Sequence, residues 1–104
     1  MKYLIALLFP AVAMANPTLE TCKAYGDMAQ HYAEARYRGA SMEELVENVR
    51  PGDDEKMAQY LIIKAYGLPP VISEGTQSEV VRDFRNNVFR QCYTHVYNAD
   101  NRQP

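Results

Sequence analysis

Two cysteines, about 70 residues apart, constrain this 104-residue chain more than any other feature. Cys22 lies near the start of the first apolar helical stripe, and Cys92 lies near the end of the last. An even cysteine count in a small exported chain predicts a disulfide, and two buried free thiols are the alternative. The bond would close a loop of about 70 residues, for which the chain-entropy estimate is about 4 kcal/mol. It would favour an antiparallel arrangement of the first and last helices.

Apolar residues recur at helical spacing in four segments, and no strand pattern competes with them. The expected helices run from about Thr18 to Arg38, from Ser41 for about two turns, from Asp53 or Asp54 to Gly67, and from Thr76 to about Tyr97. The stretches "SMEE" and "TQSE" predict capping boxes at the second and fourth starts. Gly39 is a natural stop for the first helix. The predicted fold is all-α, a small bundle of about four helices, one of them short, held by one disulfide.

The first 15 residues are typical of a cleavable signal peptide. Lys2 is followed by the apolar run Tyr3 to Val12, and the small residues Ala13 and Ala15 flank Met14. An uncleaved anchor is the alternative, although Pro10 and the shortness of the run argue against a membrane span. We therefore expect a signal peptide at 1–15 cleaved after Ala15, a helical domain at 16–97, and a polar, disordered tail at 98–104. The mature protein would be periplasmic or secreted.

Charge excludes some classes of partner. Lys2 is the only charge in the leader, so cleavage changes the formal net charge from −2 to −3. Nucleic acid would favour a basic stripe, and an amphipathic membrane helix would carry Lys and Arg along its polar face. Neither pattern is present in the sequence, so we expect no nucleic acid partner and no membrane partner after cleavage.

Candidate catalytic and metal-binding residues are few. Asp27, His31 and Glu34 share one flank of the first helix, but charged residues at this spacing also form ordinary surface pairs. Stable metal sites usually need three or four ligands with defined geometry. Cys22 could act as a nucleophile with His31 or His95, although a structural bond is the expected use of an exported cysteine. We expect no enzyme, no metal and no cofactor, and a small hydrolase or metal-binding protein using His31 is the minor alternative.

Tyrosine stands out in the composition, with eight residues and no tryptophan. Tyrosine is enriched in protein interfaces. Four tyrosines lie off the main stripes or at helix ends and indicate a candidate interaction surface: Tyr37, Tyr66, Tyr93 and Tyr97. Four arginines could join them in this surface: Arg36, Arg38, Arg85 and Arg90. Partly buried tyrosines that seal a small core are the alternative.

The tetrapeptide Lys-Ala-Tyr-Gly occurs twice, ending at Gly26 and at Gly67. The similarity does not extend beyond these four residues, so it is a coincidence. Gly26 lies inside a helix, where it costs about 1 kcal/mol against alanine. We therefore expect close packing of another helix at Gly26, near the disulfide.

The leader, the cysteine one turn into a long helix, the junction "ARYRGASMEEL" and the late second cysteine together resemble a loose set of small exported proteins of Gram-negative bacteria and their phages. Most of these have no assigned function. The general plan is also similar to periplasmic acid-stress chaperones and to immunity proteins against secreted toxins. The resulting hypothesis is an exported, non-enzymatic binding protein whose partner is another protein. A stress chaperone or an immunity or inhibitor protein is the alternative, and the oligomeric state stays open.

Overall fold

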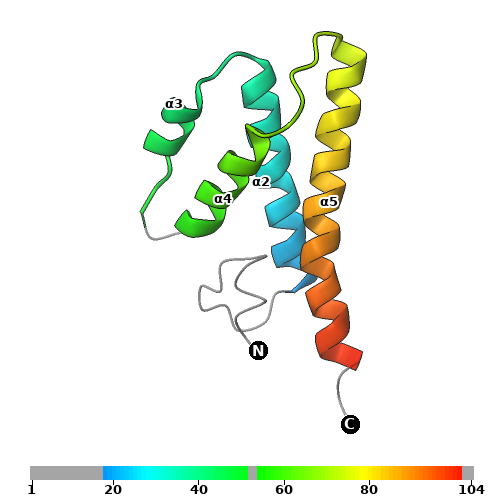
Figure 1. Cartoon of the computed structure of the whole chain (residues 1–104). Helices are drawn as coiled ribbons and strands as arrows, with labels where there is room; N and C mark the ends of the chain where they lie inside the picture. The colour runs from blue at the N-terminus through cyan, green and yellow to red at the C-terminus, as the bar shows by residue number, and fades with distance from the viewer. Residues whose placement is uncertain (1–17, 52–53, 102–104) are drawn as a thin grey trace.

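The computed structural model describes residues 18–51 and 54–101, and within these ranges it contains helices and no strand. The helices are α2 (Leu19–Tyr37), α3 (Met42–Glu47), α4 (Glu55–Ala65) and α5 (Glu74–Asn101). The long helices α2 and α5 lie side by side and run in opposite directions, while α4 packs on the same hairpin and the short α3 lies outside it (Figure 1). The predicted all-α bundle is confirmed.

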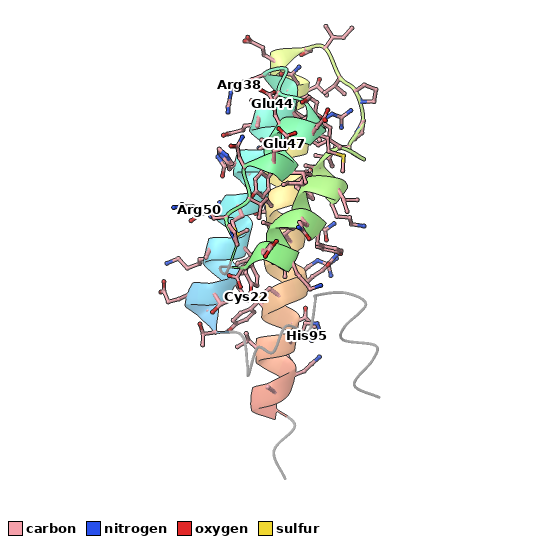
Figure 2. The ribbon with its side chains drawn as sticks, turned by 90° about the vertical axis from the view of Figure 1, so that its left-hand side faces the viewer. Cys22, Arg38, Glu44, Glu47, Arg50 and His95 are labelled. Atoms are coloured by element: carbon pink, nitrogen blue, oxygen red, sulfur yellow. A yellow bond between two sulfur atoms is a disulfide. The ribbon has the colours of Figure 1, made fainter. Side chains whose placement is uncertain are left out.

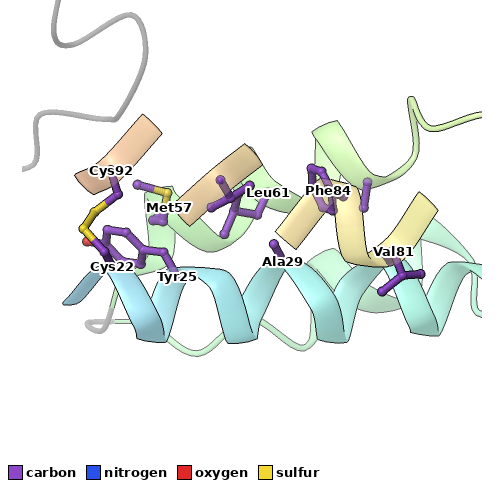
Figure 3. Close-up of a cluster of buried hydrophobic side chains, with 11 residues drawn as sticks. Cys22, Tyr25, Ala29, Met57, Leu61, Val81, Phe84 and Cys92 are labelled. Atoms are coloured by element: carbon purple, nitrogen blue, oxygen red, sulfur yellow. A yellow bond between two sulfur atoms is a disulfide. The ribbon is translucent and has the colours of Figure 1, made fainter. Parts of the chain in front are cut away.

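A disulfide joins Cys22 to Cys92, whose Cα atoms are 5.5 Å apart, and it confirms the predicted pairing over two free thiols. The bond lies at one end of a hydrophobic core that continues between the helices (Figure 3). The fully buried Leu61 and Met57 come from α4, so this apolar segment lies at the centre of the core, as expected. The core members are Cys22, Tyr25, Ala29, Ala33, Met57, Leu61, Ala65, Val81, Phe84, Val88 and Cys92.

Local capping chemistry sets the ends of α2 and the start of α3. Thr18 accepts a hydrogen bond from the backbone N–H of Thr21 at the start of α2. At the other end, Gly39 has a φ of +101°, and the N–H of Ala40 donates to Ala35 O at 3.0 Å, which together form a glycine-closed helix end. The predicted capping box of α3 is present, with Ser41 and Glu44 bonding each other's backbone N–H.

The start of α5 corrects the sequence prediction. The helix begins at Glu74, two residues before Thr76, because Ser73 Oγ accepts the N–H of Thr76 at 3.3 Å and caps the first turn. The "TQSE" stretch therefore lies inside the helix and does not form a capping box. The helix also continues to Asn101, four residues beyond the predicted end at Tyr97, so residues 98–101 are helical.

Asp54 precedes α4 without a side-chain capping bond, and Asp53 lies outside the described residues. The expected signal peptide at 1–15, its cleavage after Ala15 and residues 102–104 of the tail lie outside them as well. Among the described helices, none is both long and apolar enough to span a membrane.

Candidate functional site

A groove with a volume of about 590 Å³ lies between the second half of α2 and the first half of α5. Side chains of both helices line it, and most of them are polar or charged. The α2 wall consists of Gln30, Glu34, Tyr37 and Arg38, and the α5 wall consists of Glu74, Gln77, Ser78, Val81, Arg82 and Arg85. Three of the expected interaction residues, Tyr37, Arg38 and Arg85, therefore lie in one groove.

A chain of polar contacts at this groove joins the two helices and fixes them relative to each other. Arg85 Nη1 on α5 lies 2.5 Å from Asp27 Oδ1 and donates to Gln30 Oε1 at 3.1 Å. Gln30 Nε2 in turn donates to Glu34 Oε2 at 3.0 Å. Because the Arg85 side chain is only 33% exposed, it acts as a cross-link between α2 and α5.

The remaining two arginines of the groove are more available to a ligand. Arg38 is exposed at the end of α2 opposite Cys22 (Figure 2). Arg82 lies 3.9 Å from Asp83, and both side chains are mostly exposed, at 65% and 76%. Exposed pairs of this kind contribute little stability, so Arg82 can exchange this neighbour for a ligand at low cost.

Arg36 and Tyr66 support the groove from behind. Arg36 Nη1 donates to Ala65 O at 3.1 Å and also to Leu68 O, so it binds the carbonyls at the end of α4. Its guanidinium lies over the rings of Tyr37 and Tyr66, 5.4 and 5.6 Å from the ring centroids. Arg36 and Tyr66 therefore bind other parts of the same chain. This agrees with the alternative interpretation, in which partly buried tyrosines seal the core.

Two tyrosine hydroxyls close the same cluster. Tyr37 OH donates to Pro69 O at 2.6 Å, and Tyr66 OH donates to Ala40 O. Burial raises the pKa of the Tyr66 phenol above its ordinary value; the charge of Arg36 opposes this rise and that of Glu44 adds to it. The cluster therefore ties the α4–α5 connection and the α2–α3 junction to the end of α2 and holds Tyr37 in place.

The other expected interaction residues lie on the second half of α5, away from the groove. Tyr93 and Tyr97 are 41% and 57% exposed, and Tyr93 stacks on Phe89 with ring centroids 5.7 Å apart. Arg90 is exposed and donates to Asn87 Oδ1 at 3.4 Å. The eight expected residues are thus divided among the groove, its support and the far half of α5.

The flank of Asp27, His31 and Glu34 is not arranged as a metal site. Asp27 is paired with Arg85, and Glu34 accepts from Gln30, so both carboxylates have other side-chain partners. His31 is exposed, and its ring meets Tyr32 edge-on at 5.4 Å. Within residues 18–51 and 54–101, no cluster of three or more His, Cys, Asp and Glu could hold a metal ion.

Sequence reasoning missed Gln30, Gln77, Ser78 and Arg82 as groove residues. The cysteine pair could have indicated them, because the bond fixes which residues of the antiparallel α2 and α5 face each other. Gln30 lies eight residues after Cys22, and Phe84 lies eight residues before Cys92. Phe84 is the immediate neighbour of Arg85, which does contact Gln30. The disulfide thus predicts the register of the two helices and the pairs that face each other.

Gly26 is buried on α2 where α5 passes. A Cβ atom placed there would lie 3.5 Å from Arg85 Cγ and 3.8 Å from Arg85 O, both ordinary contact distances.

Comparison of the chain with known protein families, with curated proteins and with solved structures finds no match in any of the three.

Proposed function

We propose that this protein is an exported, non-enzymatic binding protein that holds a segment of another protein in the groove between α2 and α5. The observation that carries the proposal is the groove itself, where Tyr37, Arg38 and Arg82 surround a hollow of about 590 Å³. Tyrosine and arginine are the residue types that most often dominate the energy of protein interfaces.

The rigidity of the walls supports a binding role. The disulfide joins the two helices at one end, and Arg85 of the groove joins them through Asp27 and Gln30. Tyr37 is held by its own hydrogen bond to Pro69 O and by the guanidinium of Arg36. A site that is already ordered loses less conformational entropy when its partner binds.

The chemistry of the side chains favours binding over catalysis. Both cysteines are consumed in the disulfide, and the carboxylates beside His31 have other partners. The proposed export accounts for the bond, since disulfides persist mainly in oxidising compartments.

Site-specific photo-crosslinking in the exporting cell tests the groove. A photoreactive amino acid at Ser78 faces the groove, whereas one at Asn87 is nine residues, or two and a half turns, further along α5 and faces the opposite side. We expect one defined protein adduct from Ser78 and none from Asn87. The double variant Arg38→Ala with Arg82→Ala should lose the adduct, and Arg90→Ala should keep it.

Equal adducts from both positions, or an adduct that forms equally in the arginine variants, would contradict the groove as the binding site.

Export is tested separately by the mass of the purified protein. We expect the mature chain to begin at Asn16 and to be recovered from the periplasmic or extracellular fraction, and a full-length cytoplasmic chain would contradict export.

A further inference from the structure

The side chain of Ile62 is fully buried, although it lies outside the cluster of core residues between α4 and the α2–α5 hairpin. That cluster takes Met57, Leu61 and Ala65 from α4, which are four residues apart and lie on one helix face. Ile62 follows Leu61 and therefore points about 100° away from this face. Some other part of the chain therefore covers it.

The neighbours of Ile62 along its own stripe of α4 show what covers it. Ala58, one turn before Ile62, shares a small hollow with Val49, which lies just after α3. Tyr66, one turn after Ile62, donates its hydroxyl to Ala40 O, just before α3. The chain between these two contacts is α3, which packs against α4 (Figure 1). Ile62 is therefore buried under α3.

The short helix α3 is itself weakly attached. None of its six residues is buried, and Met42 and Val46 are 37% and 38% exposed. Its capping box joins Ser41 to Glu44 and is internal to the segment, so it adds no attachment to the rest of the molecule. Since a helix of this length is not stable alone, α3 depends on its contact with α4 and on the hydrogen bond from Tyr66.

We propose that residues 40–50, which contain α3, form a lid that opens and closes over Ile62 while the α2–α5 hairpin and its core stay folded. Opening exposes Ile62 and the half-buried Leu45 and Val49, but it leaves the disulfide and the core cluster in place. Segments with few buried apolar contacts open at a lower free energy than the whole protein unfolds. The open lid uncovers an apolar stripe of α4 that the closed molecule hides. No lid residue lines the groove, so this inference does not rest on the proposed function.

Hydrogen exchange of backbone amides, followed by NMR on the oxidised, isotope-labelled protein at low urea concentrations, tests the lid. The amides of Leu45 and Asn48 donate to carbonyls within the lid, so their exchange reports its opening. The amides of Leu61 and Val88 lie inside α4 and α5 and report unfolding of the core. We expect the lid amides to be protected, but about 100-fold less or weaker still than the core amides. Their exchange should depend little on urea, because opening the lid exposes little surface.

Two neighbouring isoleucines of α4 provide a matched pair of variants, since Ile62 is buried and Ile63 is 57% exposed. Ile62→Ala should speed exchange of the lid amides by roughly tenfold or more, because closing the lid then buries less apolar surface. Ile63→Ala should change it by less than about twofold.

Two tyrosines provide a second matched pair. Each donates its hydroxyl to a backbone carbonyl, Tyr66 to Ala40 O of the lid and Tyr37 to Pro69 O outside it. Tyr66→Phe should speed exchange of the lid amides by about 3–10-fold, because opening no longer breaks this bond. Tyr37→Phe removes a bond that stays intact when the lid opens, so it should leave their exchange unchanged.

Three outcomes would overturn the inference. If the lid and core amides show the same protection and the same urea dependence, α3 opens only when the whole protein unfolds. If the lid amides exchange as fast as in an unfolded chain, α3 does not close over Ile62. If Ile63→Ala acts like Ile62→Ala, or Tyr37→Phe acts like Tyr66→Phe, then Ile62 and Tyr66 do not hold the lid closed.

Discussion

Gly26 and Gly39 differ in what limits a larger side chain at the two positions. At Gly26 an added Cβ would meet Arg85 Cγ at 3.5 Å, an ordinary contact, whereas Gly39 has open space around it but a φ of +101°. We expect Gly26→Ala to raise the free energy of unfolding by about 0.5–1 kcal/mol, since alanine is the better helix former. Gly39→Ala should lower it by about 1–2 kcal/mol, because an L side chain is strained in the left-handed conformation. Urea unfolding of both variants measures the difference.

A Gly26→Ala protein that unfolds at lower urea than the parent would show that Arg85 cannot move aside. The sequence predicts close packing of another helix at Gly26, and α5 does pass there. The contact is made mainly by the flexible side chain of Arg85 at ordinary distances, which leaves room for a methyl group.

Arg36 joins helices that are distant in the sequence through two carbonyls and two aromatic rings. We expect Arg36→Ala to lower the free energy of unfolding by about 1.5–3 kcal/mol, the usual range for hydrogen bonds to a charged group. Arg90→Ala is the matched control, since Arg90 is exposed and its guanidinium donates to Asn87, three residues away on the same helix. Equal unfolding midpoints for the two variants would contradict a role for Arg36 in holding the α4–α5 connection.

At the scale of the elements, the first turn of α5 depends on Ser73. Its Oγ accepts the N–H of Thr76, so Ser73→Ala should lower the free energy of unfolding by about 0.5–2 kcal/mol. Thr76→Ala should change it by less than about 0.5 kcal/mol, because Thr76 lies within the helix and is exposed. Circular dichroism during urea unfolding measures both variants. If Thr76→Ala lowers the free energy of unfolding more than Ser73→Ala does, the helix start expected from "TQSE" is correct and the start at Glu74 is wrong.

The disulfide should contribute about 4 kcal/mol through the loop of 70 residues that it closes. We expect the reduced protein to unfold at much lower urea than the oxidised one, and the Cys22→Ala, Cys92→Ala double variant to behave like the reduced protein. Alkylation of the unfolded, unreduced protein should label neither cysteine. Labelling of both, or equal stability with and without reductant, would contradict the bond.

The sequence was sufficient where the relevant chemistry is local. Gly39 and the Ser41–Glu44 pair each act on a backbone group within a few residues, and the sequence predicts both. The capping bond of Thr18 is equally local, but the sequence analysis predicted only an approximate helix start there. Ser73 and Thr76 illustrate the limit, since both residue types can cap a helix and the sequence pattern indicated the wrong one of the two. The carbonyls bound by Arg36 lie 29 and 32 residues away, and no local pattern indicates such a pair. The groove depends on the register of two helices, which only the disulfide could have supplied.

At the scale of the whole molecule, one buried and two half-buried tyrosines link stability to pH. Burial raises the pKa of Tyr25, Tyr32 and Tyr66 above the ordinary value of 10.0, and the charge of Asp54 adds to the rise at Tyr25. In the unfolded chain these groups ionise near pH 10. Between that pH and their higher pKa values in the folded protein, the native state binds more protons than the unfolded state. The free energy of unfolding therefore falls as the pH rises through this range, and these groups do not change it below about pH 9.

Urea unfolding at about pH 8 and pH 10.5, together with the absorbance of ionised tyrosine, measures this effect. We expect the midpoint to drop at the higher pH and part of the tyrosine signal to develop only as the protein unfolds. Tyr32→Phe should reduce the drop because it removes one of these three phenols, whereas Tyr93→Phe, at a ring that is 41% exposed, removes none of them and should leave the drop unchanged. If the midpoint is the same at both pH values, or if Tyr93→Phe reduces the drop as much as Tyr32→Phe, then burial in the bundle does not hold these phenols in their neutral form.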